Sequence, residues 1–159
     1  MKIRVAKIQE FKKLWQYSNS PTYNYFINQL NRNNVEFWTI ELSDSLIGEL
    51  YVFWDSEDKD EANGIDRAYL CAFRIEKSHQ GHGFGKKLMS AVLERVKSQG
   101  YKEVTIGIDN NNFAKLKTMY EKMGFINQIK FTNVDYHYRD FKGKPTIYKE
   151  PYMLKMKVL

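Results

Sequence analysis

The stretch "RAYLCAFRIEKSHQGHGFGKKLMSAVLERVKSQGYKEVTIGID", residues 67–109, decides the fold. It begins with a run, 67–76, that is apolar on both faces at its centre, which is typical of a central strand. Residues 85–99 place apolar side chains along one side of a predicted helix, and Gly100 follows as a natural helix terminator. A second strand is predicted at 101–109. Strand, helix and strand in this order predict a parallel, right-handed βαβ unit.

The remaining segments surround this unit with further helices and strands. Phe11, Leu14 and Trp15 fall at helical spacing near the N-terminus. Helices are predicted at 7–20, 22–34 and 110–124, and strands at 35–42, 46–54, 125–131 and 151–159. The strands at 35–42 and 46–54 form a hairpin in this prediction. We therefore expect an α/β fold with a mixed sheet in a single domain, residues 1–159.

Composition and charge limit the classes of protein. A chain of 159 residues suits one domain, and its single cysteine excludes an internal disulfide. Cys71 lies in a strand-like run without a nearby histidine, which favours a core thiol over a nucleophile. No signal peptide and no membrane-spanning run is found, so a cytoplasmic protein without membrane contact is expected. The formal net charge of +6 favours an anionic partner. No nucleic-acid-binding motif accompanies that charge, so nucleic acid is not the expected partner.

Three glycines, Gly81, Gly83 and Gly85, lie between the central strand and the helix. Free N–H groups at a helix N-terminus favour phosphate, and glycine lets a ligand approach the backbone. The P-loop pattern GxxxxGK[ST] fails at position 80 and after Lys86. The pattern GxGxxG fails because Lys86 and Leu88 stand where its last glycine is required. The glycines therefore indicate an anion cradle of another kind, with a flexible connection as the alternative.

The pattern Q-x-x-G-x-G at 80–85 resembles the pyrophosphate-binding signature of the GNAT superfamily of acyl-CoA-dependent N-acetyltransferases. The segment "MYEKMGF", 119–125, is similar to that family's second signature. The resemblance covers 1–131 as architecture and 67–125 as motif. It implies a GNAT-like fold with splayed parallel strands and acetyl-CoA as cosubstrate. It also implies transfer of an acetyl group to a primary amine of a small molecule or peptide, by direct attack in a ternary complex.

The resemblance further implies roles for individual residues. The pantetheine arm would bond to the backbone of the central strand, where the N–H of Phe73 or Arg74 would polarise the thioester carbonyl. Tyr120 would protonate the leaving thiolate, and a buried core tyrosine is the alternative for this residue. The expected cofactor-binding residues are Phe73, Arg74, Ile75, Gln80, Gly81, His82, Gly83, Phe84, Gly85, Lys86 and Asn112.

The sequence leaves alternatives open for the pantetheine-binding asparagine and for the general base. The family places that asparagine seven residues before the tyrosine, whereas Asn112 lies eight before Tyr120. Asn112 therefore either contacts pantetheine or only caps the helix. Glu49 and Glu76 are candidate general bases, and a water chain is the alternative. The histidines share no metal-ligand spacing, so no metal is expected.

The acceptor amine is expected opposite the cofactor, at a site built by the first helices, the acidic loop 55–64 and the segment 135–140. Negative charge in that loop would attract a cationic amine, and a merely solvated loop is the alternative. Several tyrosines also fit the contact surface of a homodimer. A non-catalytic acyl-CoA-binding module of the same fold is the alternative to the enzyme.

Overall fold

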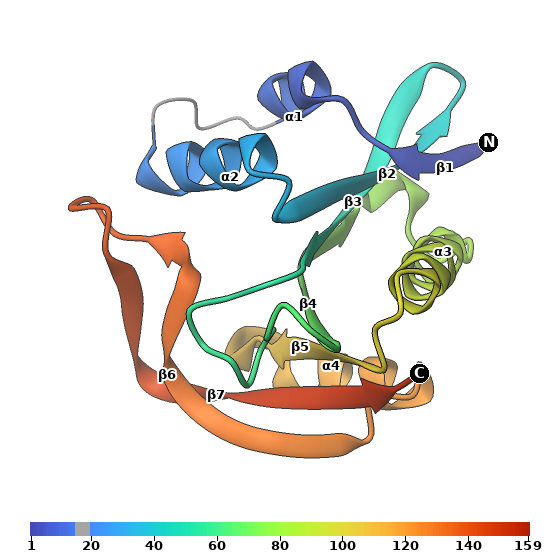
Figure 1. Cartoon of the computed structure of the whole chain (residues 1–159). Coiled ribbons are helices and arrows are strands. Elements are labelled where there is room, and N and C mark those ends of the chain that lie inside the picture. The colour runs from blue at the N-terminus through green and yellow to red at the C-terminus, as the bar shows by residue number, and fades with distance from the viewer. Residues whose placement is uncertain (15–19) are drawn as a thin grey trace.

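The computed structural model describes residues 1–14 and 20–159 (Figure 1). Its helices are α1 (Ile8–Leu14), α2 (Pro21–Asn31), α3 (Phe84–Ser98) and α4 (Phe113–Lys122), with short 3₁₀ helices η1 (Lys77–His79) and η2 (Asn110–Asn112). Its strands are β1 (Lys2–Val5), β2 (Val35–Leu42), β3 (Ser45–Phe53), β4 (Arg67–Ile75), β5 (Glu103–Ile108), β6 (Asn127–Arg139) and β7 (Pro145–Val158).

Within these residues the strands form one seven-stranded sheet in the order β1-β2-β3-β4-β5-β7-β6. β4 and β5 are paired in parallel, and the other neighbours are antiparallel. The connection between β4 and β5 runs through α3. The predicted βαβ unit and mixed sheet are therefore confirmed.

Two apolar clusters fill the two sides of the sheet. On one side, α3 and α4 cover β-strand residues such as Leu70 and Ile106, both fully or almost fully buried. On the other side, α1 and α2 bring Phe11 and Phe26 against the aromatic residues of β3 (Figure 1). Cys71 lies in this second cluster, where burial raises the pKa of its thiol, so the expectation of a core thiol is met.

The observed elements differ from the predicted ones at both ends of the chain. The four-residue strand β1 was not predicted, because it is too short for its alternation to stand out. The strand expected at 125–131 continues as β6 and forms a long hairpin with β7, which curves toward α2 (Figure 1). Three register shifts interrupt this hairpin, and bulges of that kind break the alternation that reveals a strand. Trp15, which falls at helical spacing with Phe11 and Leu14, lies outside the described residues.

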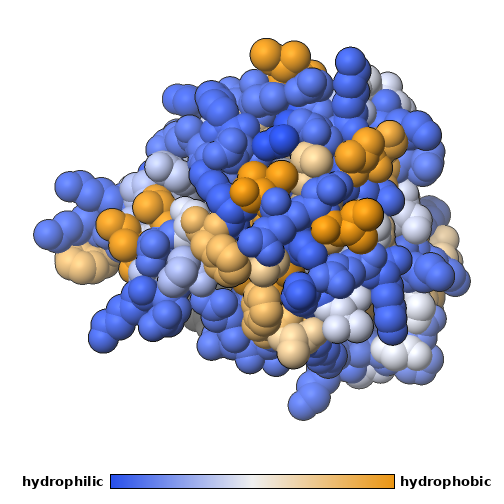
Figure 2. Space-filling model, turned by 90° about the horizontal axis from the view of Figure 1, so that it is seen from below, coloured by the Kyte–Doolittle hydropathy of each residue, from blue (hydrophilic) through white to orange (hydrophobic). Residues whose placement is uncertain are grey.

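The end of the β6–β7 hairpin is attached to α2. The Oγ1 of Thr22 accepts a hydrogen bond from the N–H of Arg139 at 2.9 Å and donates one to its carbonyl oxygen at 3.2 Å. The Arg139 guanidinium also lies over the Tyr25 ring, 4.1 Å from its centroid. Figure 2 shows the face seen from below as largely hydrophilic, with hydrophobic groups scattered between polar ones. The homodimer stays a prediction.

Candidate functional site

The parallel strands β4 and β5 separate near the middle of β4. In the described part of the chain their pairing ends at Leu70 with Ile106, so residues 71–75 continue β4 without β5 beside them. Ala72 has a φ of +52° and lies at a bulge where two residues of β4 face one residue of β3. The β5-facing backbone groups of this segment are therefore available to a ligand.

The glycine loop connects the end of β4 to α3. The Nε2 of Gln80 donates a hydrogen bond to the carbonyl oxygen of Ile75 at 2.9 Å, which ties the loop to the strand. Gly81 and Gly83 have φ values of +79° and +81°, the left-handed region that favours glycine. A Cβ at either position would meet no atom within 4 Å. The backbone there is open on one side, as the approach of a phosphate group requires.

Gly85 has a different role from the other two glycines. It lies inside α3, where a Cβ would come within 3.2 Å of the Phe73 ring, so its absence lets the helix pack closely on β4. The N–H of Lys87 donates the first helical hydrogen bond, to the carbonyl oxygen of Gly83 at 3.1 Å. The amides of residues 84–86 precede that bond and have no helical partner. They coincide with the predicted phosphate-binding amides.

The polar side chains of the loop lie at the surface. His82 and Lys86 are both exposed, and the Nδ1 of His82 lies 3.3 Å from the carbonyl oxygen of His79. Phe84 is partly buried and packs on the α3 cluster. Lys86 and Lys87 therefore add positive charge beside the free amides.

Tyr120 lies next to the bulged part of β4. It is 6% exposed, and its ring centroid lies 6.4 Å from that of Phe73 and 6.1 Å from that of Phe125. Burial, and to a lesser extent the charge of Asp109, raises the pKa of Tyr120 to about 12. The phenol is therefore protonated at neutral pH and can serve as a proton donor.

Asn112 occupies the N-cap position of α4, but its side chain makes no capping hydrogen bond. The preceding turn is capped by Asp109, whose carboxylate accepts a hydrogen bond from the N–H of Asn111 at 2.9 Å. The irregular start of α4 means that ideal helical spacing does not hold across this turn. The side chain of Asn112 is exposed, and a pantetheine contact stays a prediction.

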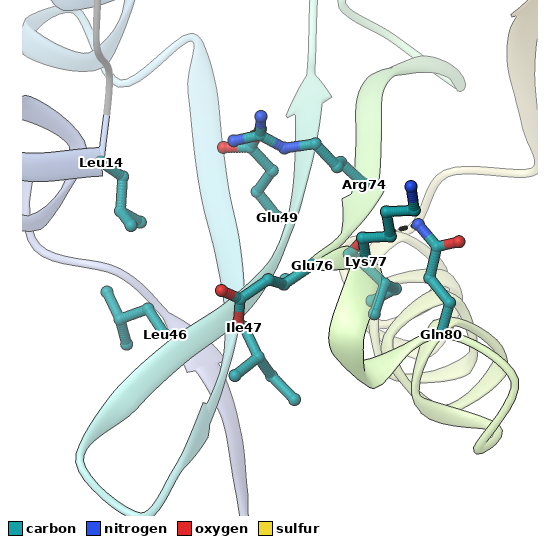
Figure 3. A pocket seen from close by; sticks show the side chains of 10 residues that line it. Leu14, Leu46, Ile47, Glu49, Arg74, Glu76, Lys77 and Gln80 are labelled. Atoms are coloured by element: carbon teal, nitrogen blue, oxygen red, sulfur yellow. Dashed lines mark hydrogen bonds and ion pairs between the residues drawn. The ribbon is translucent and has the colours of Figure 1, made fainter.

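Glu49 and Glu76 line the same hollow, of about 400 Å³, beside the end of β4 (Figure 3). The Glu49 carboxylate accepts a hydrogen bond from the Tyr51 hydroxyl at 3.3 Å and forms an ion pair with Arg74 at 2.9 Å. Burial raises the pKa of Glu49 despite the opposing effect of the Arg74 charge. Glu76 is exposed, with the His79 imidazole 3.2 Å away. The full lining is Leu14, Leu46, Ile47, Gly48, Glu49, Arg74, Ile75, Glu76, Lys77 and Gln80.

The ion pair of Glu49 with Arg74 and the apolar side of the hollow were not predicted from the sequence. The strand order was the signal that could have indicated this contact. Because β3 pairs with β4 in antiparallel orientation, Glu49 of β3 lies beside the end of β4. The register could not be counted, since the bulge at Ala72 shifts it by one residue.

The acidic loop 55–64 does not contribute to this hollow. It connects β3 to the start of β4, whereas the glycine loop follows the end of β4, so the two loops lie at opposite ends of that strand. Its carboxylates have partners within the fold, including Glu61, which is fully buried with an oxygen 2.7 Å from the Nε2 of His137. Lys130 forms ion pairs with both Asp58 and Asp60. The loop therefore lies outside this hollow, and its part in binding the acceptor stays a prediction.

In the segment 135–140, Asp135 has its partners within the fold, and the part of this segment in binding the acceptor stays a prediction. Asp135 is buried and accepts hydrogen bonds from two backbone N–H groups and from the Tyr148 hydroxyl.

In the described ranges, no three His, Cys, Asp or Glu side chains gather as metal ligands would. No helix among the described residues is long and apolar enough to cross a bilayer.

The chain is similar to known proteins in sequence and in fold. Residues 3–125 match the model of the acetyltransferase (GNAT) family. The probable spermine N(1)-acetyltransferase of Bacillus subtilis subsp. natto is 32% identical over 78 residues, which are 48% of this chain and 49% of that protein. The chain thus spans about half the length of that relative.

Two solved structures share the fold over nearly the whole chain. The ribosomal-protein-alanine N-acetyltransferase of Brucella melitensis has a TM-score of 0.69 at 14% identity, covering 100% of both chains. A GNAT family acetyltransferase of Elizabethkingia anophelis with acetyl-CoA bound has a TM-score of 0.63 at 17% identity, covering 99% of this chain and 97% of that chain.

Proposed function

Because the chain belongs to the acetyltransferase (GNAT) family, we propose that it transfers an acetyl group from acetyl-CoA to a primary amine. The observation that supports this proposal is that three features of the structure lie next to one another. The unpaired backbone of β4, the start of α3 at Gly85 directly after the open part of the glycine loop, and the buried Tyr120 adjoin one another around Phe73. A thioester placed there would have a backbone donor and a proton donor beside it.

The donor half of the reaction uses mostly backbone groups. In this proposal the amides from Gly81 to Lys86 hold the pyrophosphate, and β4 residues 73–75 bond to the pantetheine arm. Acetyl-CoA supplies an activated acyl carbon. The N–H of Phe73 or Arg74 stabilises negative charge that develops on the carbonyl oxygen, an effect worth on the order of 3 kcal/mol of barrier.

Side chains near the proposed site can accept and donate the protons that the reaction moves. The amine attacks as a free base, so Glu49, Glu76 or a water chain first accepts a proton from the ammonium group. A bond forms between the amine nitrogen and the acyl carbon, and the bond from that carbon to sulfur breaks. Tyr120 gives its proton to the departing thiolate, and the nitrogen returns a proton to Tyr120 as it loses its second one to become the amide nitrogen.

The acceptor class stays open between a small molecule and a peptide. The sequence relative described above is named for spermine, and the Brucella structure is named for the alanine of a ribosomal protein. Both names specify an amino group as acceptor. They therefore support acetyl transfer to nitrogen and leave the acceptor to be measured.

Two measurements test the proposal. Acetyl-CoA should raise the thermal unfolding temperature in a concentration-dependent way, because a ligand of the native state stabilises it. Release of free thiol from acetyl-CoA should then depend on an added amine, across a panel of small amines and peptides. Absence of any thermal shift at millimolar acetyl-CoA would contradict cofactor binding. A shift without thiol release for any amine would favour the non-catalytic acyl-CoA-binding module.

A further inference from the structure

Glu49 is buried on the side of the sheet that α1 and α2 cover. Its neighbour two positions along β3, Tyr51, packs against Phe11 of α1 with ring centroids 6.0 Å apart. Phe73 and Ile75 of β4 pack instead on the α3 side. Glu49 therefore faces the side of β4 opposite to the start of α3, from which an acceptor can approach without crossing the glycine loop.

The ion pair between Glu49 and Arg74 is strongly asymmetric. The Glu49 side chain is 11% exposed, whereas the Arg74 side chain is 65% exposed. A buried carboxylate needs a positive partner, because an unpaired charge out of water is unfavourable. An exposed guanidinium can return to water at little cost. Any cation that enters the hollow can therefore replace Arg74.

The rest of the hollow indicates the shape of such a cation. Leu14 of α1 and Leu46 at the start of β3 form an apolar side, and Figure 3 shows the carboxylates of Glu49 and Glu76 facing the space beside them. Lys77 also lines the hollow, and the same view shows its side chain beside that of Gln80. An alkyl chain fits the apolar side, and each carboxylate is suited to one ammonium group.

We propose that this hollow is the acceptor subsite and that it takes a linear aliphatic amine with a second positive charge. In the protein without acceptor, the guanidinium of Arg74 occupies the place beside Glu49 that the ammonium group takes when the acceptor binds. This inference rests on the proposed acetyl transfer. Glu49 binds the amine that reacts, and Glu76 binds the second cationic group near the rim. The guanidinium of Arg74 turns into solvent when the acceptor binds.

The test compares 1,4-diaminobutane with n-butylamine as acceptors, since the two differ by one amino group. We expect kcat/KM to be at least tenfold higher for the diamine. Glu76→Gln should reduce this ratio at least fivefold. Arg74→Gln should lower the KM for the diamine at least threefold, because the competing cation is absent and the free fraction of the subsite rises. Arg95→Gln is the matched control, since Arg95 forms an ion pair with Glu36 at 2.7 Å outside the hollow.

The outcomes separate this inference from the proposed function. If other amines or peptides release thiol but the diamine is no better than butylamine, the acceptor inference is wrong and acetyl transfer stands. If no amine releases thiol, the proposed function itself fails. If Arg74→Gln and Arg95→Gln change KM equally, Arg74 does not occupy the subsite. Should Arg74→Gln not fold, calorimetric titration of diaminobutane into the wild type and Glu49→Gln, with CoA present, decides: equal affinities overturn the inference.

Discussion

Substituting alanine for Gly83 should affect both stability and acetyl-CoA binding, whereas the same change at Gly100 should affect stability alone. The two glycines flank α3 and have nearly the same conformation, with φ values of +81° and +84°. A Cβ at either meets no atom within 4 Å, so neither variant creates a clash. A left-handed conformation costs a residue with a Cβ about 1–2 kcal/mol. Both variants should lose about that much free energy of unfolding.

Ligand binding should distinguish the two positions. At Gly83 the new methyl group enters the open side of the loop, where the pyrophosphate is proposed to lie. We expect at least a tenfold loss of acetyl-CoA affinity, about 1.4 kcal/mol, for Gly83→Ala and no loss for Gly100→Ala. Gly83→Asn adds a test of cause, since asparagine tolerates this backbone conformation. It should recover part of the stability and none of the affinity.

Urea unfolding measures the stability of each variant, and calorimetric titration measures its acetyl-CoA affinity. Equal acetyl-CoA affinity in Gly83→Ala and Gly100→Ala would refute the cradle. Recovery of both stability and acetyl-CoA affinity in Gly83→Asn would also refute the cradle. The loss of affinity in Gly83→Ala would then come from backbone strain in the loop and not from contact between the methyl group and the ligand.

Three further predictions concern single side chains. Tyr120→Phe should lower kcat at least tenfold with little change in acetyl-CoA affinity, and unchanged turnover would exclude Tyr120 as the proton donor. Glu61→Ala should lower the free energy of unfolding by roughly 3 kcal/mol, because it removes the buried carboxylate that contacts His137 and Ser56, and a loss near zero in urea unfolding would contradict this. Arg4 lowers the pKa of Glu10 to about 2, so the ion pair stabilises the fold above pH 4.5 and loses this effect as the pH falls toward 2. Glu10→Gln should therefore cost about 1 kcal/mol at pH 7 and almost nothing near pH 2 in urea unfolding, whereas a pH-independent cost would count against this pairing.

The central unit could be predicted from sequence because its signals are local. The βαβ order follows from hydrophobic periodicity within residues 67–109, and the glycine loop is found by spacing alone. The burial of Glu61 could not be predicted, because its partner His137 lies 76 positions away and a run of acidic residues normally indicates a solvated loop. The lengths of β6 and β7 were missed for a related reason, since bulges interrupt their alternation.

The bulge at Ala72 relates the donor side of the proposed site to the acceptor side. Before it, Tyr69 and Cys71 of β4 pack into the cluster covered by α1 and α2. Strict alternation would send Phe73 to the same cluster, yet Phe73 packs on the opposite side, near Tyr120. The extra residue reverses the two faces, so Arg74 lies opposite Glu49 while Phe73 packs against the start of α3, directly after the glycine loop. An alanine with a φ of +52° is strained, and this strain at the point where the two sides meet is consistent with a functional bulge.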